Sequence, residues 1–292
     1  MKITQISRRE NCSVFVKAPI LKNLVLVKLN QNQRHALRTL AHLDALKNVT
    51  ISHVSAAVVH NLNTIYLKQV THFIVNKRRT SKNESLKFHF YKSNYEVTKL
   101  FGVPITSIEQ TVIDCAKTLS FAESIVSADS ALRKGVTKNR LRELASNMDQ
   151  ARYQKKIGKV IDSCTSLSES AGESLARVML MALELPVPKL QYKFSTPTRN
   201  YYTDFYFSDL FLIVEFDGME KYQGKCQKPE QVFINERARD EVLFRKGISV
   251  IHFTWSELHR PVVMMQKFQP YMDITLQNII HNYQRCGIEI YD

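Results

Sequence analysis

Three acidic residues lie in two apolar segments near residue 210: Asp204 in the first, Glu215 and Asp217 in the second. Isolated buried carboxylates are costly, so such residues in strand-like segments need a reason. We predict an antiparallel hairpin with a turn at residues 208–209, in which Asp204 faces Ile213 and is a diagonal neighbour of Glu215. All three carboxylates then share one face, with room for a divalent cation. The alternative is a solvated sheet face.

Two further features extend this acidic group. Glu169 and Glu173 are four residues apart on a predicted helix over 168–185, so they share a face and either can add a carboxylate. Lys221 follows Asp217 by four residues. Phosphodiester hydrolysis uses such a set, because carboxylates hold one or two metal ions, the metal activates water, and a cation stabilises the transition state.

The charge is divided unevenly along the chain. Of 292 residues, 41 are basic and 27 acidic, a net charge of +14. Residues 1–160 contain 27 basic and 10 acidic residues (+17), and residues 161–292 contain 14 and 17 (−3). This pattern predicts a polyanion-binding front part, although a solvated basic surface is the alternative. The candidate phosphate contacts are Lys77, Arg78, Arg79 and Lys82 in a basic turn, and Arg237 and Arg239 on a helix.

Composition excludes several classes of protein. Hydrophobic residues make up 44%, which excludes wholesale disorder, and no apolar run approaches the roughly 18 to 20 residues of a membrane span. Five scattered cysteines without a Cys-x-x-Cys pair argue against a disulfide framework and a cysteine zinc site. The first ten residues lack a secretion signal, so we expect a cytoplasmic protein that does not contact membranes. No phosphate-binding glycine loop, zinc-protease motif or serine-hydrolase elbow occurs.

The elements predict two domains, 1–160 and 161–292, both of mixed α/β (α+β) class. In the first, we expect strands over 12–29, helices over 32–47 and 52–62, strands at 72–75 and 86–91, and helices over 106–146 with Glu109 in a capping box. Polar residues 147–168 form the predicted boundary. In the second, the helix over 168–185 and the hairpin precede a helix over 230–246, a strand over 248–254 and a helix over 270–285.

Histidines give weaker signals. His53 and His60 are seven residues apart and would share a helix face, but the sequence indicates no third ligand, so we predict packing or capping roles. His252 lies on the predicted strand that follows the Arg237 helix. A core position is favoured for it, with substrate contact as the alternative.

The rear half resembles a known family. Its motifs are SESAGESLAR (168–177), Leu-Pro (185–186), Asp-Phe (204–205), VEFDG (214–218) and Lys-Tyr (221–222). In this order they resemble the DUF559-type family, PD-(D/E)XK-fold proteins related to very-short-patch-repair (Vsr) endonucleases. The resemblance implies a mixed sheet flanked by helices, with Mg²⁺, or Mn²⁺, held by Asp204, Glu215 and Asp217. It implies Glu173 as the helix carboxylate. Asp217 stands where the wider superfamily has lysine, so Lys221 would supply the cation.

The front half resembles, through VTISHVSAA (49–57) and VPITSIEQTVID (103–114), the N-terminal region of AbiEi-like proteins. This resemblance implies association with DNA in a phage-defence or toxin–antitoxin-like context and so favours DNA over RNA, between which the residues themselves do not decide. The chain is therefore expected to be a metal-dependent DNA endonuclease. The alternatives are a catalytically silent, antitoxin-like DNA-binding regulator and a component that acts with a protein partner encoded nearby. The sequence gives no oligomeric state.

Overall fold

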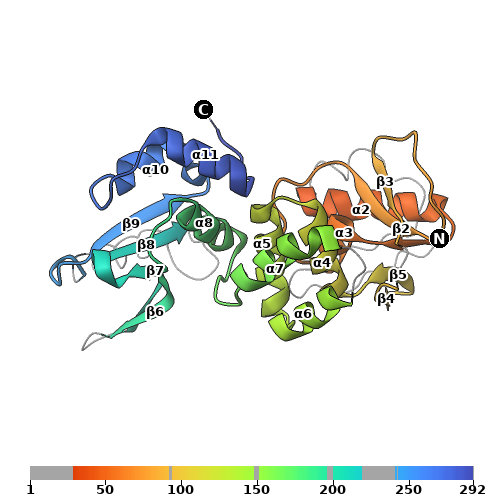
Figure 1. The fold of residues 1–292 in the computed structure, drawn as a ribbon, viewed down its shortest axis with the longest axis horizontal. Coiled ribbons are helices and arrows are strands. Elements are labelled where there is room, and N and C mark those ends of the chain that lie inside the picture. Colours follow the sequence, from red (N-terminus) through yellow and green to blue (C-terminus); the bar gives the residue numbers. More distant parts are fainter. Residues whose placement is uncertain are drawn as a thin grey trace. The chain divides into compact units, whose positions relative to one another are not determined.

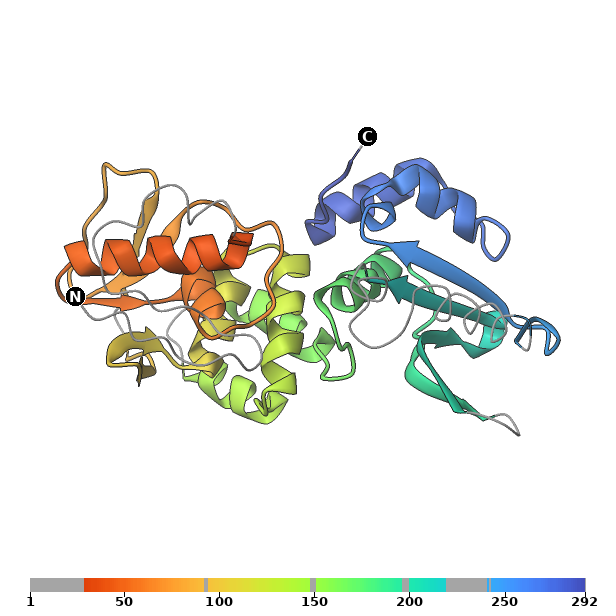
Figure 2. The same ribbon diagram turned by 180° about the vertical axis from the view of Figure 1, so that it is seen from behind.

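The computed structural model describes residues 29–91, 94–147, 151–195, 200–218, 241 and 243–291. The chain forms two compact units, 1–164 and 165–292 (Figures 1 and 2). The division falls four residues later than expected, because helix α7 (Ala151–Ser163) occupies the polar segment that we predicted as a boundary. Ile157, Val160 and Ile161 of α7 are buried, so this segment belongs to the front unit's core.

The front unit is a mixed sheet with helices. Its sheet has the order β3-β2-β1-β5-β4, in which β1–β5 and β2–β3 pair in parallel and the other neighbours pair antiparallel. The predicted strands at 12–29 lie outside the described residues except for Leu29, which is not in a strand. In chain order the elements before α7 are α2 (Gln31–Ala45), β1 (Val49–Ile51), α3 (His53–Val59), β2 (Thr71–Val75), β3 (Leu86–His89), β4 (Val97–Leu100), β5 (Val103–Thr106), α4 (Ile108–Thr118), α5 (Phe121–Arg133) and α6 (Lys138–Ser146).

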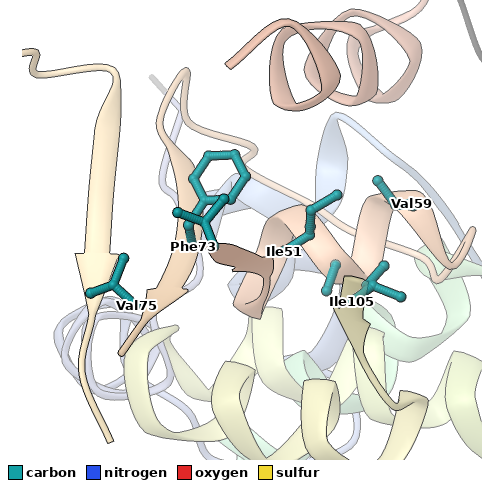
Figure 3. Packing of buried hydrophobic residues seen from close by; sticks show 7 residues of the cluster. Ile51, Val59, Phe73, Val75 and Ile105 are labelled. Carbon is teal, nitrogen blue, oxygen red and sulfur yellow. The ribbon is translucent and has the colours of Figure 1, made fainter. Parts of the chain in front are cut away.

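Apolar residues from four of these elements form the core of the front sheet. Figure 3 shows Ile51 of β1, Val59 of α3, Phe73 and Val75 of β2, and Ile105 of β5 packed together. Phe73, Ile51 and Ile105 have no exposed surface. Burial of this apolar surface is the main force that holds α3 against the centre of the sheet. It thereby fixes the position of His53, the first residue of α3.

Side-chain caps set where the helices begin. Asn30 with Gln33 and Ser120 with Glu123 form capping boxes at α2 and α5. Helix α4 begins after Ser107 as expected, but the predicted box with Glu109 is wrong, because the third helical position is Gln110 and its backbone N–H donates to Ser107 Oγ. Among the described residues, no helix combines the length and the apolar character needed to cross a membrane.

The rear unit is also a mixed α/β arrangement, as expected. Its sheet has the order β6-β7-β8-β9, with β9 parallel to β8 and the other pairs antiparallel. Most of the predicted helix over 230–246 lies outside the described residues, and Gly247 after it has φ +74°, as a glycine that ends a helix does. The elements are α8 (Ala171–Ala182), β6 (Lys189–Ser195), β7 (Asn200–Phe207), β8 (Leu212–Asp217), β9 (Ser249–Thr254), α10 (Pro261–Phe268) and α11 (Leu276–Cys286).

The two faces of the rear sheet differ. Phe216 of β8 packs against Gly172 of α8, and Phe253 of β9 stacks on Phe268 of α10 with ring centroids 5.8 Å apart. Phe216 and Phe253 are register partners, so α8 and α10 cover the same face (Figure 1). Side chains alternate along each strand, so Glu215 points to the opposite face.

Candidate functional site

The hairpin that carries the acidic residues has a different register from the expected one. Phe205 pairs with Val214, so the expected pairing of Asp204 with Ile213 is wrong by two residues. The reason is the turn: residues 208–210 form a 3-10 turn, and Phe211 follows in the left-handed region with φ 47°. The connection is therefore longer than the two-residue turn that we predicted, and its centre lies further along the chain.

This register brings Asp204 and Glu215 closer than expected. Extending it by one residue beyond Phe205 places Asp204 directly opposite Glu215 instead of diagonal to it. Asp204 Oδ2 accepts a hydrogen bond of 2.8 Å from the backbone N–H of Phe216, and Gln191 Nε2 donates to its Oδ1 at 3.4 Å. Asp204 is half-buried, whereas Glu215 is only 3% exposed. Two carboxylates from neighbouring strands thus share one face.

Asp217 lies two residues further along β8, on the face of Glu215. Its Oδ2 lies 3.0 Å from His252 Nδ1, and His252 is the register partner of Glu215 on β9. His252 is half-buried, not the core residue that the sequence favoured. The histidine therefore orients Asp217, a role that the sequence did not indicate.

Helix α8 adds a fourth carboxylate. Ser170 caps α8 by accepting from the backbone N–H of Glu173 at 3.1 Å, and Glu173 Oε2 accepts from the backbone N–H of Glu169 at 2.7 Å. Burial raises the pKa of the Glu173 carboxyl, and the negative charge of Asp204 raises it further. Of the two glutamates proposed from sequence, Glu173 is half-buried and near enough to Asp204 for the charge of that residue to raise its pKa, although α8 covers the face of the sheet opposite Glu215. Glu169 is exposed.

Gly172 allows α8 to approach the sheet this closely. A Cβ atom at Gly172 would lie 2.0 Å from Cε1 of Phe216, a distance that no real contact tolerates. We expect Gly172→Ala to lower the free energy of unfolding of the rear unit by about 1–3 kcal/mol, because the Phe216 ring or the start of α8 must move. Fluorescence of Trp255, the only tryptophan, reports this in a urea titration, since its ring packs edge-on against Phe216.

Gly158→Ala is the matched control for this substitution. Gly158 lies inside α7 with open space where a Cβ would stand, so alanine there should stabilise the front unit by up to about 1 kcal/mol. If Gly172→Ala leaves the rear unit as stable as the wild type, close packing of α8 on Phe216 is not what positions Glu173.

The raised pKa of Glu173 predicts a dependence of stability on pH. A carboxyl whose pKa is higher in the folded state stabilises the fold below its unfolded pKa, near 4.5, and this contribution is lost as pH rises through the folded value. In EDTA, Glu173→Gln should therefore match the wild type in acid and become more stable than it toward neutral pH. Urea titrations at several pH values measure the difference in free energy of unfolding between the variant and the wild type. A difference that does not change with pH would contradict a raised pKa at Glu173.

The predicted phosphate contacts of the front unit are exposed, in the loop between β2 and β3. The guanidinium of Arg79 lies 4.1 Å from the ring centroid of Phe88, and that of Arg78 lies 5.6 Å from the ring of Phe90. Stacking on the rings restrains both arginines while their N–H groups stay in water. Lys77 and Lys82 are also exposed in this loop. Lys221, Arg237 and Arg239 lie outside the described residues.

A histidine cluster in the front unit was missed. Within the described residues, one set of three ligand-bearing side chains has its donor atoms within 4.8 Å of one another: His53, His72 and His89. The rear carboxylates do not meet this criterion. The expected neighbour of His53 was His60, but His60 Nε2 instead lies 2.7 Å from the carbonyl oxygen of Thr106. Only the parallel pairing of β2 with β3 brings His72 and His89 together, so the cluster could have been predicted only from this pairing.

Buried polar groups surround this cluster. His72 Nδ1 lies 3.1 Å from His89 Nε2, and the ring of His53 stacks on that of His89 with centroids 3.6 Å apart. Burial lowers the pKa of His72 to about 3 and that of His89 to about 4. Tyr91 O–H lies 3.3 Å from His53 Nε2 and donates to Asp114 Oδ1 at 2.7 Å. The imidazoles are therefore neutral near pH 7, so that each ring has one nitrogen with a lone pair.

No protein-family model, curated protein or solved structure gives a significant match to this chain. The DUF559-type and AbiEi-like resemblances thus rest on their sequence motifs. The chemistry of the chain has to be argued from its own side chains.

Proposed function

We propose that the chain is a Mg²⁺-dependent endonuclease, in which the rear unit hydrolyses phosphodiester bonds and the basic front unit holds DNA. The observation that carries this proposal is the register that sets Asp204 opposite Glu215 on neighbouring strands, with the charge of Asp204 acting on the Glu173 carboxyl of α8. Solvated sheet faces do not bury a glutamate to 3% exposure. The helix–hairpin–parallel strand order of the rear unit suits the PD-(D/E)XK fold that the motifs imply.

The donor set fits magnesium. All of the strand and helix ligands proposed are carboxylates, the hard oxygen donors that Mg²⁺ prefers. Mg²⁺ keeps several of its waters and takes only one or two protein carboxylates, which suits carboxylates that are near one another without converging. Burial raises the pKa of Glu173, and the negative charge of Asp204 raises it further; a bound cation would offset that charge.

Each side chain has a role that follows from its surroundings. Asp204 and Glu215 would hold the metal ion, which when bound supplies an activated water and neutralises charge on the phosphate. Asp217, oriented by His252, adds a further oxygen at the edge of this group. Glu173 binds a proton more readily than an ordinary glutamate, so it is suited to accept one from the attacking water. Lys221 would stabilise the transition state.

The loop between β2 and β3 is proposed to hold the DNA backbone. Removal of one phosphate-binding side chain should reduce the slope of log affinity against log salt by about 0.9 for duplex DNA. We expect Arg78→Ala/Arg79→Ala to weaken binding and to lower this slope by about 1.8, measured by fluorescence anisotropy in EDTA. The matched control is Arg245→Ala/Lys246→Ala, two exposed basic residues of the rear unit. An equal loss of affinity in both double variants would show that the loop has no special role.

The function is tested by incubating the full-length chain at low salt with single- and double-stranded DNA and RNA, in Mg²⁺, Mn²⁺ or EDTA. We expect DNA cleavage in either metal and none in EDTA. Tight, salt-dependent DNA binding without cleavage in any metal would contradict the nuclease and favour the silent DNA-binding regulator. Absence of both binding and cleavage would contradict the nuclease and the regulator together.

A further inference from the structure

We propose that His53, His72 and His89 of the front unit bind a divalent transition-metal ion of the zinc class. This site is separate from the rear carboxylates, and the proposal does not depend on nuclease activity. It would add a second metal of different chemistry to the chain, because imidazole nitrogen suits zinc, copper, nickel or cobalt and is a poor ligand for Mg²⁺.

The distances between the three histidines suit a bound metal ion. Each histidine contributes a ring nitrogen, and the three nitrogens lie within 4.8 Å of one another. Ligand nitrogens about 2.0–2.1 Å from a tetrahedral zinc ion are a little over 3 Å apart. The pair from His72 and His89, at 3.1 Å, already has this spacing. Binding therefore needs the proton of the His72–His89 hydrogen bond to move to another ring nitrogen, and His53 to release one of its contacts with Ser52 and Tyr91 and turn toward the other two rings.

The backbone holds the three histidines at one place. His53 is the first residue of α3 and has φ 53°, in the left-handed region that histidine adopts at a cost. His72 and His89 come from two parallel strands, in which His72 pairs with Lys87 and His89 follows two residues later on the same face. Three separate elements are thus fixed by the core so that their histidines meet.

Polar side chains lie beside His53. In metal sites, such groups form hydrogen bonds to the histidine ligands and hold their rings in orientation. Ser52 Oγ lies 2.9 Å from His53 Nδ1, and Tyr91 O–H lies 3.3 Å from His53 Nε2. Tyr91 is itself anchored on Asp114, whose second oxygen, Oδ2, is fully buried with no hydrogen-bond partner among the described residues. This chain of hydroxyls and a carboxylate is the kind of shell that holds an imidazole in place, and three protein ligands leave a fourth position for water or substrate.

His53 and His89 differ in their distance from the surface. His53 is 1% exposed, whereas His89 is half-buried on strand β3, near the exposed Lys87. The side of β3 is therefore the side from which we expect an ion to enter. A transition metal bound there would link α3 to both strands, so it should raise the thermal stability of the front unit.

The test is a Zn²⁺ titration of EDTA-stripped full-length chain against a zinc-binding dye, with the visible absorption of bound Co²⁺ as a second reading. We expect one Zn²⁺ per chain, no competition from excess Mg²⁺, and a Co²⁺ spectrum of a low-coordinate nitrogen site. His72→Asn and His89→Gln should each weaken Zn²⁺ binding by about 100-fold or more, since even outer partners contribute about 10- to 100-fold. His281→Gln, at an exposed histidine of the rear unit, is the matched control.

Two outcomes would overturn the proposal. One is wild-type Zn²⁺ affinity in both variants, which would place the ion elsewhere. The other is a folded wild-type chain that binds no Zn²⁺ or gives the Co²⁺ spectrum of the hydrated ion, a reading that does not require the variants to fold. Asp204→Asn should bind Zn²⁺ like the wild type, so failure of the nuclease proposal and failure of this one are distinguishable.

Discussion

Asp204→Asn is expected to lower the rate of Mg²⁺-dependent DNA cleavage by about 1,000-fold or more while leaving the fold intact. Asparagine keeps the side-chain volume and an oxygen that can accept from the backbone N–H of Phe216, so the start of the β7–β8 ladder should survive. It removes the negative charge opposite Glu215. Since a bound metal contributes several kcal/mol of transition-state stabilisation, and each ~1.36 kcal/mol is tenfold in rate, loss of a charged ligand costs at least this much.

Asp209→Asn is the matched control, because Asp209 is exposed in the turn of the same hairpin and its only described side-chain bond is with Ser208. Single-turnover cleavage with saturating Mg²⁺ measures the rate, and Trp255 fluorescence checks the fold. The control should cleave like the wild type. If Asp204→Asn retains more than about a tenth of the wild-type rate, Asp204 is not a metal ligand and the acidic face of β7 and β8 is not the active site.

The sequence predicted which residues share this face better than it predicted how they pair. The true register differs from the expected one by two residues, and a shift of two leaves every side chain on the same face because the strand period is two. A shift of one would have separated Asp204 from Glu215. The pairing itself depended on the 3-10 turn before Phe211, whose left-handed backbone at a bulky residue has no reliable local signal.

Other features were beyond the sequence because they depend on contacts between distant segments. Helix α7 is polar overall, with only a narrow buried stripe that includes Ile157, Val160 and Ile161, so its composition was typical of a linker. The histidine cluster required the parallel pairing of β2 with β3, two strands that a hairpin interpretation would pair antiparallel. The contact of His252 with Asp217 depends on the parallel pairing of β9 with β8. In each case tertiary pairing decided what local pattern could not.

The second large effect is expected in the front unit, at the buried ion pair beneath Tyr91. Asp114 Oδ1 accepts from Tyr91 O–H at 2.7 Å and from Gln110 Nε2 at 2.8 Å, and lies 3.4 Å from Lys117 Nζ. The side chains of Asp114 and Lys117 are 0% and 3% exposed. Asp114→Asn should lower the free energy of unfolding by about 3–5 kcal/mol, because asparagine keeps an acceptor for Tyr91 but leaves the Lys117 ammonium buried without a counter-charge.

A double variant separates this cause from simple loss of packing. Asp114→Asn/Lys117→Met removes the unpaired positive charge of Lys117, so it should recover more than half of the lost stability. If the two substitutions acted independently, their destabilising effects would instead add. Urea transitions followed by circular dichroism should shift, while the Trp255 fluorescence transition of the rear unit stays in place. Asp162→Asn, which breaks the exposed pair with Arg142, should cost less than about 1 kcal/mol although its 2.9 Å contact is shorter. Equal costs at the two aspartates would contradict burial as the cause of the large effect at Asp114.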